Sequence, residues 1–303
     1  METKQIKEEI NRMKKERKAI ILAHLYQVDE IQEIADFTGD SLELSRKTAL
    51  TDAETIVFCG VKFMAETAKI LSPEKMVLLP ALDAGCPMAD MIARDDVLKL
   101  KKNNPGAAVV CYVNSSAEVK AVSDYCCTSA NAVNLVRSIP EQEIIFIPDK
   151  NLGQYIARKV PEKNFIFWEG FCVTHHRIRG KDLTAARKLH PGVPVLVHPE
   201  CQPEITKGAD FTGSTGQILK HVRESDSDEF IIGTEMGILY RLTTENPEKS
   251  FVLLSTGLIC PNMKKTRLYD VYMALLEKKH QVHIADDIRR KALVALNRML
   301  ELS

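Results

Sequence analysis

The segment PEKMVLLPALDAGC (residues 73–86) decides the fold, because two later segments repeat its pattern. PEKNFIFWEGFC spans residues 161–172, and PEKSFVLLSTGLIC spans residues 247–260. Each segment starts with Pro-Glu-Lys, continues as an apolar run and ends in a cysteine. Cys172 lies 86 positions after Cys86, and Cys260 lies 88 positions after Cys172. A unit used three times predicts three domains around a shared centre, with one thiol from each.

The repeat extends upstream of these segments. Each copy starts with a charged amphipathic helix, expected at 6–16, 95–103 and 181–189. Three strands follow in each copy, expected at 19–23, 55–59 and 76–79, at 107–113, 144–147 and 164–168, and at 193–197, 230–232 and 250–254. Further helices are expected at 62–71, 152–159 and 236–243. The apolar runs are unbroken, which is typical of parallel strands that are covered on both faces.

This alternation predicts an α/β protein with three pseudo-symmetric three-layer α/β/α domains, whose mostly parallel sheets surround a central cavity. We expect the repeats to span residues 1–90, 91–178 and 179–263. The tail, residues 264–303, is expected to pack on the first repeat through a final helix near 286–302.

Composition narrows the class of protein. The chain has 303 residues, of which 45% are hydrophobic and 27% are charged, as in soluble globular proteins. Lys+Arg and Asp+Glu both number 41, so charge gives no argument for nucleic acid or a membrane surface as a partner. The first apolar run, residues 19–23, is too short for a secretory core or a membrane span. We therefore expect a cytoplasmic protein, in which eight cysteines serve as thiols or ligands rather than as disulfides.

Polar residues follow the predicted strands at matching places in the repeats. His24, Asn114 and His198 end the first strands, and Ser41, Ser129 and Ser214 follow 15 to 17 positions later. Ligands of parallel sheets bind at the carboxyl ends of the strands. A serine at a helix N-terminus can bind a carboxylate or phosphate. The alternatives are plain N-caps for the serines and satisfied core residues for the histidines.

Glu200, in His198-Pro199-Glu200-Cys201, is the best candidate for a general base. Tyr26, two residues after His24, is a candidate proton-relay partner. A buried glutamate needs a raised pKa to act as a base near neutrality, so a raised pKa is expected for Glu200.

Three thiolates can hold either of two metal groups. Zinc with three thiolates and a water is one, and a 4Fe–4S cluster with one open iron is the other. The other five cysteines (Cys59, Cys111, Cys126, Cys127 and Cys201) are out of register with the repeat, although the last three remain reserve candidates. Widely spaced ligands around a roomy cavity favour the cluster. Its open iron would act as a Lewis acid in dehydration or condensation.

Motifs along the whole chain resemble the quinolinate synthase (quinolinate synthetase A) family. They are Ala23-His24-Leu25-Tyr26-Gln27, Ile34-Ala35-Asp36, Gly39-Asp40-Ser41-Leu42, Phe63-Met64-Ala65-Glu66, Cys86-Pro87-Met88-Ala89, Tyr112-Val113-Asn114-Ser115, Cys127-Thr128-Ser129-Ala130-Asn131, His198-Pro199-Glu200-Cys201, Gly213-Ser214-Thr215-Gly216 and Cys260-Pro261-Asn262-Met263-Lys264. Each motif alone is weak, but their order makes the resemblance specific.

The resemblance implies three α/β domains around a 4Fe–4S cluster with Cys86, Cys172 and Cys260 as ligands. It implies a transferase of NAD biosynthesis that condenses iminoaspartate with dihydroxyacetone phosphate to quinolinate, losing phosphate and two waters. An iminoaspartate-producing enzyme is the implied functional partner. Catalytic roles fall to Glu200, Tyr26 and His198. The substrate-binding positions are His24, Ser41, Tyr112, Asn114, Ser129, His175, His198, Glu200, Ser214 and Thr215.

The chain departs from the family pattern at two places. Leu25 stands where the family usually has Asn, and Phe171 precedes the second cysteine where it usually has His. The second change leaves open whether His175 or His176 faces the cavity. Two rival functions also stay open at this point: a hydro-lyase acting on hydroxy-dicarboxylates with the same cluster, and a non-catalytic iron or redox sensor.

Overall fold

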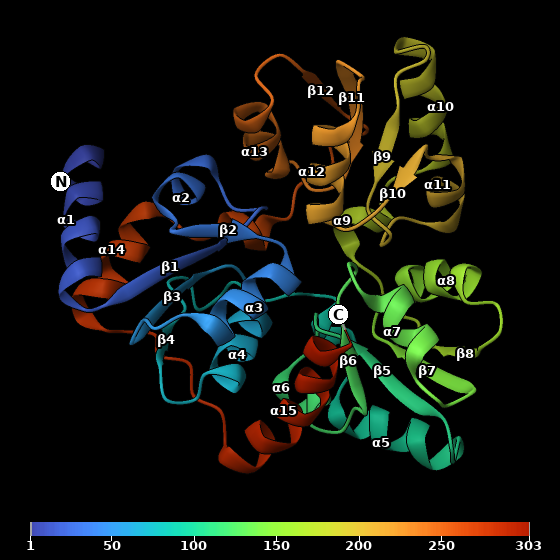
Figure 1. The fold of residues 1–303 in the computed structure, drawn as a ribbon, viewed down its shortest axis with the longest axis horizontal. Helices are drawn as coiled ribbons and strands as arrows, with labels where there is room; N and C mark the ends of the chain where they lie inside the picture. The colour runs from blue at the N-terminus through green and yellow to red at the C-terminus, as the bar shows by residue number, and fades with distance from the viewer. Residues whose placement is uncertain (1, 303) are drawn as a thin grey trace.

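In this computed structural model, which describes residues 2–302, the chain forms three four-stranded sheets in which every strand pairing is parallel. The strand order is the same in each sheet: the second strand of the unit at one edge, then the first, the third and the fourth. The three units stand around a common centre (Figure 1). This arrangement confirms the predicted α/β class with parallel sheets.

The first unit contains β1 to β4 and α1 to α4. Its strands are β1 (Ala19–His24), β2 (Phe37–Gly39), β3 (Thr55–Cys59) and β4 (Met76–Leu78). Its helices are α1 (Thr3–Glu16), α2 (Asp29–Ile34), α3 (Ser41–Leu50) and α4 (Lys62–Leu71). Every residue of β3 is buried, because helices cover both faces of the sheet.

The second unit repeats this order. Its strands are β5 (Ala108–Tyr112), β6 (Tyr125–Cys127), β7 (Glu143–Ile147) and β8 (Asn164–Phe167). Its helices are α5 (Arg94–Asn103), α6 (Ala117–Lys120), α7 (Ala132–Ser138) and α8 (Lys150–Lys159). The 3-10 turn η1 (Ala89–Met91) precedes the unit, and α9 (Val173–His176) follows it.

The third unit has strands β9 (Val195–Val197), β10 (Phe211–Thr212), β11 (Glu229–Gly233) and β12 (Ser250–Leu253). Its helices are α10 (Gly180–Leu189), α11 (Pro203–Gly208), α12 (Thr215–Glu224) and α13 (Ile238–Glu245), and the 3-10 turn η2 (Pro261–Lys264) follows β12. The strands β2, β6 and β10, at one edge of each sheet, were not predicted because, unlike the equally short β4 and β9, they do not lie within a longer apolar run.

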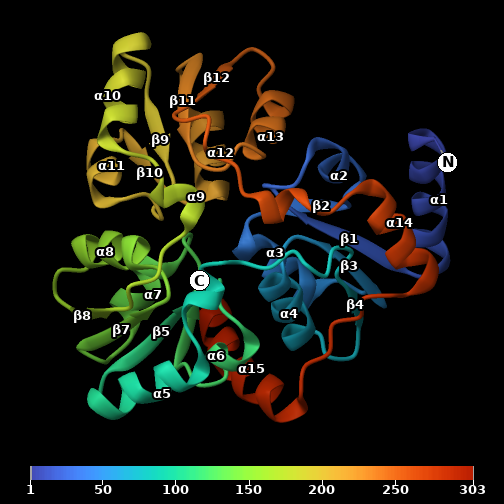
Figure 2. The same cartoon turned by 180° about the vertical axis from the view of Figure 1, so that it is seen from behind.

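The two tail helices separate onto different units (Figure 2). α14 (Leu268–Glu277) packs on α1 and β3 of the first unit, as expected. α15 (Asp286–Glu301) differs from the expectation: it packs mainly on β6 and α6 of the second unit and also contacts α4. The physical reason is its apolar stripe, since Ala292, Leu296 and Met299 complete the core of the second unit.

The domain boundaries at residues 90, 178 and 263 stay predictions, and Met1 and Ser303, the outer ends of the expected first repeat and tail, lie outside the described residues. Among the described residues, no helix combines the length and the apolar character that crossing a bilayer requires.

Candidate active site

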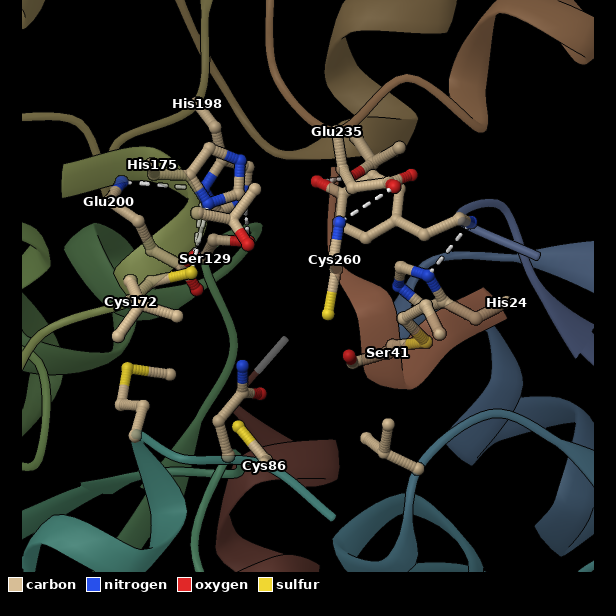
Figure 3. Close-up of a pocket in the computed structure, with 18 of the residues that line it drawn as sticks. His24, Ser41, Cys86, Ser129, Cys172, His175, His198, Glu200, Glu235 and Cys260 are labelled. Atoms are coloured by element: carbon tan, nitrogen blue, oxygen red, sulfur yellow. Dashed lines mark hydrogen bonds and ion pairs between the residues drawn. The ribbon is translucent and has the colours of Figure 1, made fainter. Parts of the chain in front are cut away.

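A pocket lies where loops at the carboxyl ends of the three sheets meet (Figure 3). It encloses about 730 Å³ when its open mouth is counted. All three units contribute polar lining residues: His24, Tyr26, Asp40, Ser41, Cys86, Tyr112, Asn114, Ser129, Cys172, Thr174, His175, His198, Glu200, Thr215, Glu235 and Cys260. Every residue predicted for the site therefore reaches this pocket, with the exception of Ser214.

The three periodic cysteines lie in the loops that follow β4, β8 and β12, and all line the pocket. Burial raises the pKa of each thiol, that of Cys86 to about 12. A negative charge on Cys260 would raise the pKa of Cys86, and one on Cys86 would raise the pKa of Cys172. The three thiols are therefore close enough to interact electrostatically. Thiols in such surroundings lose their protons only when a cation balances the thiolates. The donor set therefore fits a thiophilic metal ion or an iron–sulfur cluster.

The remaining five cysteines, all within the described residues, are free, buried and absent from the pocket lining: Cys59, Cys111, Cys126, Cys127 and Cys201. The three that remained reserve candidates thus lie outside the pocket lining.

Glu200 lies beyond β9 on the polar wall of the pocket. Its Oε1 accepts a hydrogen bond from the Tyr112 hydroxyl at 2.7 Å, and its Oε2 lies 2.7 Å from His175 Nδ1. Burial opposes the carboxylate charge, but the imidazoles of His198 and His175 and the hydrogen bonds from His175 and Tyr112 outweigh it and lower the pKa of Glu200. The pKa is thus lowered rather than raised as expected, and near neutrality the carboxylate is ionised and can accept a proton.

A chain of hydrogen bonds links Glu200 to Tyr26. His175 Nε2 lies 2.9 Å from Thr234 Oγ1, which lies 2.6 Å from the Tyr26 hydroxyl. Thr215 Oγ1 donates to that same hydroxyl at 2.9 Å. One set of directions satisfies every contact: Tyr26 donates to Thr234, and Thr234 donates to His175 Nε2. The Nδ1–H of His175 then faces Glu200, which assigns the tautomer of this imidazole from the network.

His24 and His198 adopt the same local conformation. The N–H of Tyr26 donates to His24 Nδ1 at 3.1 Å, and the N–H of Glu200 donates to His198 Nδ1 at 3.3 Å. An accepting Nδ1 places the proton on Nε2. Burial lowers the pKa of both imidazoles to about 3, so each is a neutral N–H donor. His198 Nε2 lies 3.2 Å from Ser129 Oγ.

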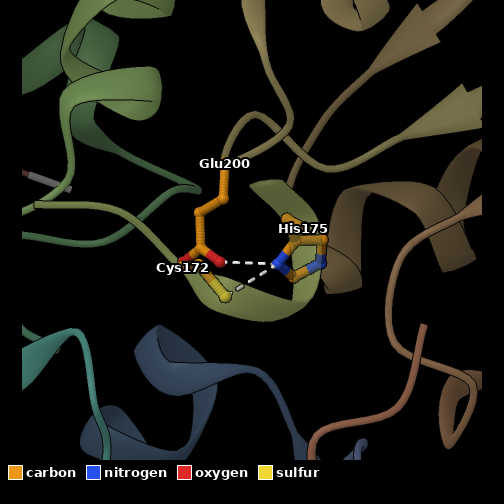
Figure 4. A group of neighbouring side chains, drawn as sticks. All are labelled: Cys172, His175 and Glu200. Carbon is orange, nitrogen blue, oxygen red and sulfur yellow. Dashed lines mark hydrogen bonds and ion pairs between the residues drawn. The ribbon is translucent and has the colours of Figure 1, made fainter. Parts of the chain in front are cut away.

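Cys172, His175 and Glu200 also form a compact group of possible metal ligands (Figure 4). One ligand atom of each lies within 4.8 Å of the others, and His175 Nδ1 is 3.2 Å from Cys172 Sγ. Sulfur, nitrogen and carboxylate oxygen are all donors that zinc accepts. Cys172 therefore shares the pocket with two other periodic thiols and also lies next to this imidazole and carboxylate.

Hydroxyl and amide groups complete the lining. Ser41, Asn114, Ser129 and Thr215 face the pocket. The buried Oδ1 of Asn114 has no hydrogen-bond partner among the described residues, so it is available to a bound molecule.

Ser214 requires a correction by one residue. It is the N-cap of α12, its Oγ accepts from Gln217 N, and it donates to Asp40 Oδ2 at 3.0 Å. Asp40 is the equivalent N-cap of α3, and the residues after the two N-caps, Ser41 and Thr215, both line the pocket. Ser214 is absent from the lining because its hydroxyl is hydrogen-bonded to Gln217 N and Asp40 Oδ2, whereas Asp40 itself still lines the pocket.

Sequence reasoning missed Asp40, Thr174 and Glu235. The signal for Glu235 was its place two residues beyond β11, at a strand end like the others. Asp40 directly precedes the predicted Ser41, but the sequence does not show that one residue both caps α3 and lines the pocket.

The two family departures have local explanations. His175 lines the pocket, whereas His176 contacts Asn151 and the Phe171 ring, with centroids 4.3 Å apart. His175 is therefore the histidine that faces the cavity. Leu25 is buried in the core cluster of the third unit, so an apolar side chain there joins the first unit to the third.

Fold and site together define a class of protein in which three α/β units surround one polar pocket and each unit contributes a cysteine to it. Residues 8–301 match the family model described as quinolinate synthetase A protein. The chain is 57% identical over 295 residues to a quinolinate synthase of Alkaliphilus metalliredigens, covering 97% of each chain. It is 55% identical over 303 residues to one of Caldicellulosiruptor saccharolyticus, covering 100% of each, and 53% identical over 302 residues to one of Geobacter metallireducens, covering 100% and 99%. The chain belongs to the quinolinate synthase family.

Proposed function

We propose that this chain condenses iminoaspartate with dihydroxyacetone phosphate to quinolinate, releasing phosphate and two waters, in the synthesis of NAD. Cys86, Cys172 and Cys260 would hold a 4Fe–4S cluster. When bound, that cluster supplies one iron without a protein ligand, which acts as a Lewis acid. The observation that carries the proposal is the position of three thiols, one from each repeat, in one pocket with Glu200 and Tyr26.

The polar lining suits two anionic substrates. Thr215 donates to the Tyr26 hydroxyl and holds it in the pocket. The neutral imidazoles of His24 and His198 offer N–H groups, and Ser41 and Ser129 offer hydroxyls. These groups can bind carboxylate and phosphate oxygens without bringing a competing charge. The open Oδ1 of Asn114 can accept a hydrogen bond from a substrate hydroxyl or imine. In the proposal, Ser214 fixes Asp40 and the start of α12 rather than touching substrate.

Proton transfer falls to the network described above. Condensation requires that a proton leave carbon and that hydroxyls leave as water. Glu200, ionised near neutrality, accepts the first proton, while the Tyr26 hydroxyl supplies or receives protons at the other end of the chain of hydrogen bonds. His198 donates a hydrogen bond to the developing charge.

The partner and location follow from chemistry. Iminoaspartate carries an imine, which hydrolyses in water, so an aspartate-oxidising enzyme must supply it close by. Eight free thiols are typical of a reducing compartment, which supports the cytoplasm as the place of the reaction.

The test is purification without oxygen, followed by measurement of iron, sulfide and quinolinate formation. Four irons and quinolinate from the two substrates are expected for the wild type. Cys172→Ala should lose the cluster and activity, whereas Cys59→Ala, at a buried thiol outside the pocket, should keep both. A wild-type chain with an intact cluster that forms no quinolinate would contradict the proposal.

A further inference from the structure

One backbone hydrogen bond recurs in all three units and ties the cysteine loop to the third strand. The donor–acceptor pairs are Lys62–Ala84, Lys150–Gly170 and Met236–Leu258, with N to O distances of 2.8, 2.8 and 2.9 Å. Each donor lies three residues after the end of β3, β7 or β11, and each acceptor lies two residues before a periodic cysteine. Positions 61, 149 and 235, one before each donor, are therefore structurally equivalent.

In the second unit this position holds Asp149, which is 0% exposed. Its Oδ2 accepts a hydrogen bond from the N–H of Cys172 at 3.0 Å. Its Oδ1 accepts from Leu152 N, in the first turn of α8, at 2.8 Å. One side chain thus joins the start of a helix to the backbone of the cysteine.

The third unit has the same connection, built by Glu235, which is also 0% exposed. Its Oε1 accepts from the N–H of Cys260 at 3.1 Å, and its Oε2 accepts from Gly237 N at 2.7 Å. Lys264 Nζ, 3.0 Å from the carboxylate, adds a charged partner. No ion pair is found for Asp149 among residues 2–302.

The first unit lacks this connection. Position 61 is Val61, a buried apolar residue that offers no acceptor. Within the part of the chain that the structure describes, the N–H of Cys86 has no hydrogen-bond acceptor. The three cysteine loops therefore share a backbone attachment, but only two have a carboxylate attachment.

Only a carboxylate can serve both ends of this connection. Its two oxygens accept from N–H groups on opposite sides, whereas an amide has one oxygen and one NH₂. Replacing Asp149 by Asn or Glu235 by Gln would place an N–H against an N–H at one end. An acidic residue is therefore needed at these positions for the contact with the cysteine N–H, and burial alone does not explain it.

We propose that Asp149 and Glu235 are positioning residues that fix the backbone of Cys172 and Cys260 and so retain the metal group these thiols hold. This inference rests on the proposed cluster. Partners that orient metal ligands typically affect affinity about 10- to 100-fold when they are removed. Between residues 2 and 302, Cys86 has no such carboxylate partner on its N–H.

The test compares iron release from cluster-loaded full-length protein, purified without oxygen and mixed with a ferrous chelator. Asp149→Asn and Glu235→Gln should each release iron about 10- to 100-fold faster than the wild type. They should also change the electron paramagnetic resonance spectrum of the reduced cluster. The matched control is Glu66→Gln: Glu66 is 8% exposed, and its carboxylate accepts from Ala117 N at 3.1 Å and not from the N–H of a periodic cysteine. It should leave both release and spectrum unchanged.

Asp149 is also the N-cap of α8, so a second variant must separate the two roles. Asp149→Ser keeps a good N-cap but has a single oxygen, which cannot also reach Cys172. It should keep the wild-type circular dichroism and melting temperature, yet release iron as fast as Asp149→Asn. Wild-type release and spectrum in folded Asp149→Ser and Glu235→Gln would overturn the inference. A wild-type chain that assembles no cluster would instead overturn the proposed function, and this inference with it.

Discussion

The first and third units present their chemistry from matching strand ends, yet with different groups. His24 at the end of β1 and His198 just after β9 both accept the N–H of the residue two positions later. That later residue is Tyr26 in the first unit and Glu200 in the third. The backbone and the imidazole are thus repeated, while the side chain two residues on differs. A repeated frame can therefore hold two unlike side chains, the proposed acid–base pair, in one pocket.

The largest effect should come from the third unit's side of this comparison. Glu200→Gln keeps the size of the side chain but removes the acceptor charge, so we expect kcat to fall about 10³-fold with the cluster retained. Quinolinate formation and iron content measure the two. Glu204→Gln, an exposed residue that contacts Gly180 N, should change neither. Full activity in Glu200→Gln would break the assignment of the base to the third unit.

Tyr26→Phe tests the first unit's side. The change removes the hydroxyl that contacts Thr234 and Thr215, and so interrupts the hydrogen-bond chain to His175. We expect kcat to fall about 10²-fold, less than for Glu200→Gln, because the base itself remains. Steady-state kinetics with both substrates provide the measurement. Tyr269→Phe, at a tyrosine that is 54% exposed, is the matched control and should behave as wild type.

Leu25 lies between His24 and Tyr26, and replacing it tests whether packing against the third unit stabilises this part of the first unit. Its side chain is buried in the third unit's core cluster. Leu25→Ala should lower the free energy of unfolding by about 2 kcal/mol through lost burial and the cavity left behind. Urea unfolding followed by circular dichroism measures this. Leu50→Ala, at a leucine that is 81% exposed, should have little effect, and an equal loss in both variants would contradict the packing role.

The two histidines should make stability depend on pH in the same way. Burial lowers the pKa of each to about 3 in the folded chain, whereas a histidine in an unfolded chain titrates near about 6.5. Between these values the unfolded chain binds more protons, so stability is full above about pH 6.5 and falls as pH drops, by about 1.4 kcal/mol per pH unit for each histidine.

Urea midpoints of the wild type, His24→Gln and His198→Gln at pH 5 and pH 7.5 measure this dependence. Each variant should reduce the slope of stability against pH by the contribution of one histidine. His283→Gln, at an exposed residue, should leave the slope unchanged. A variant that leaves the slope unchanged would show that its histidine is not kept neutral in the folded protein. His24 and His198 would then differ in charge state, which contradicts the comparison of the two strand ends.

Much of this arrangement could be predicted from the sequence, because buried parallel strands leave unbroken apolar runs and the cysteines recur with the repeat. The strands β2, β6 and β10 could not be predicted, since they lie in no longer apolar run and Phe211–Thr212 is only two residues long. Both Ser214 and Thr215 were predicted for the site; that Ser214 caps the helix and only Thr215 lines the pocket is not revealed by spacing alone.

Asp149 and Glu235 escaped notice for a different reason. Their counterpart in the first unit is Val61, so a comparison that looks for shared residues passes over them. Similarly, the amphipathic pattern of α15 predicts a buried face but does not say which unit it completes.

The position of α15 has a consequence for how the protein is made. Ala292, Ala295, Leu296 and Met299 are fully buried in the core of the second unit, although the strands of that unit end at Phe167. Domains emerging from the ribosome usually fold in order from the N-terminus. The core of the second unit departs from this order, because it is complete only after α15, which is made later than the whole third unit, has been synthesised.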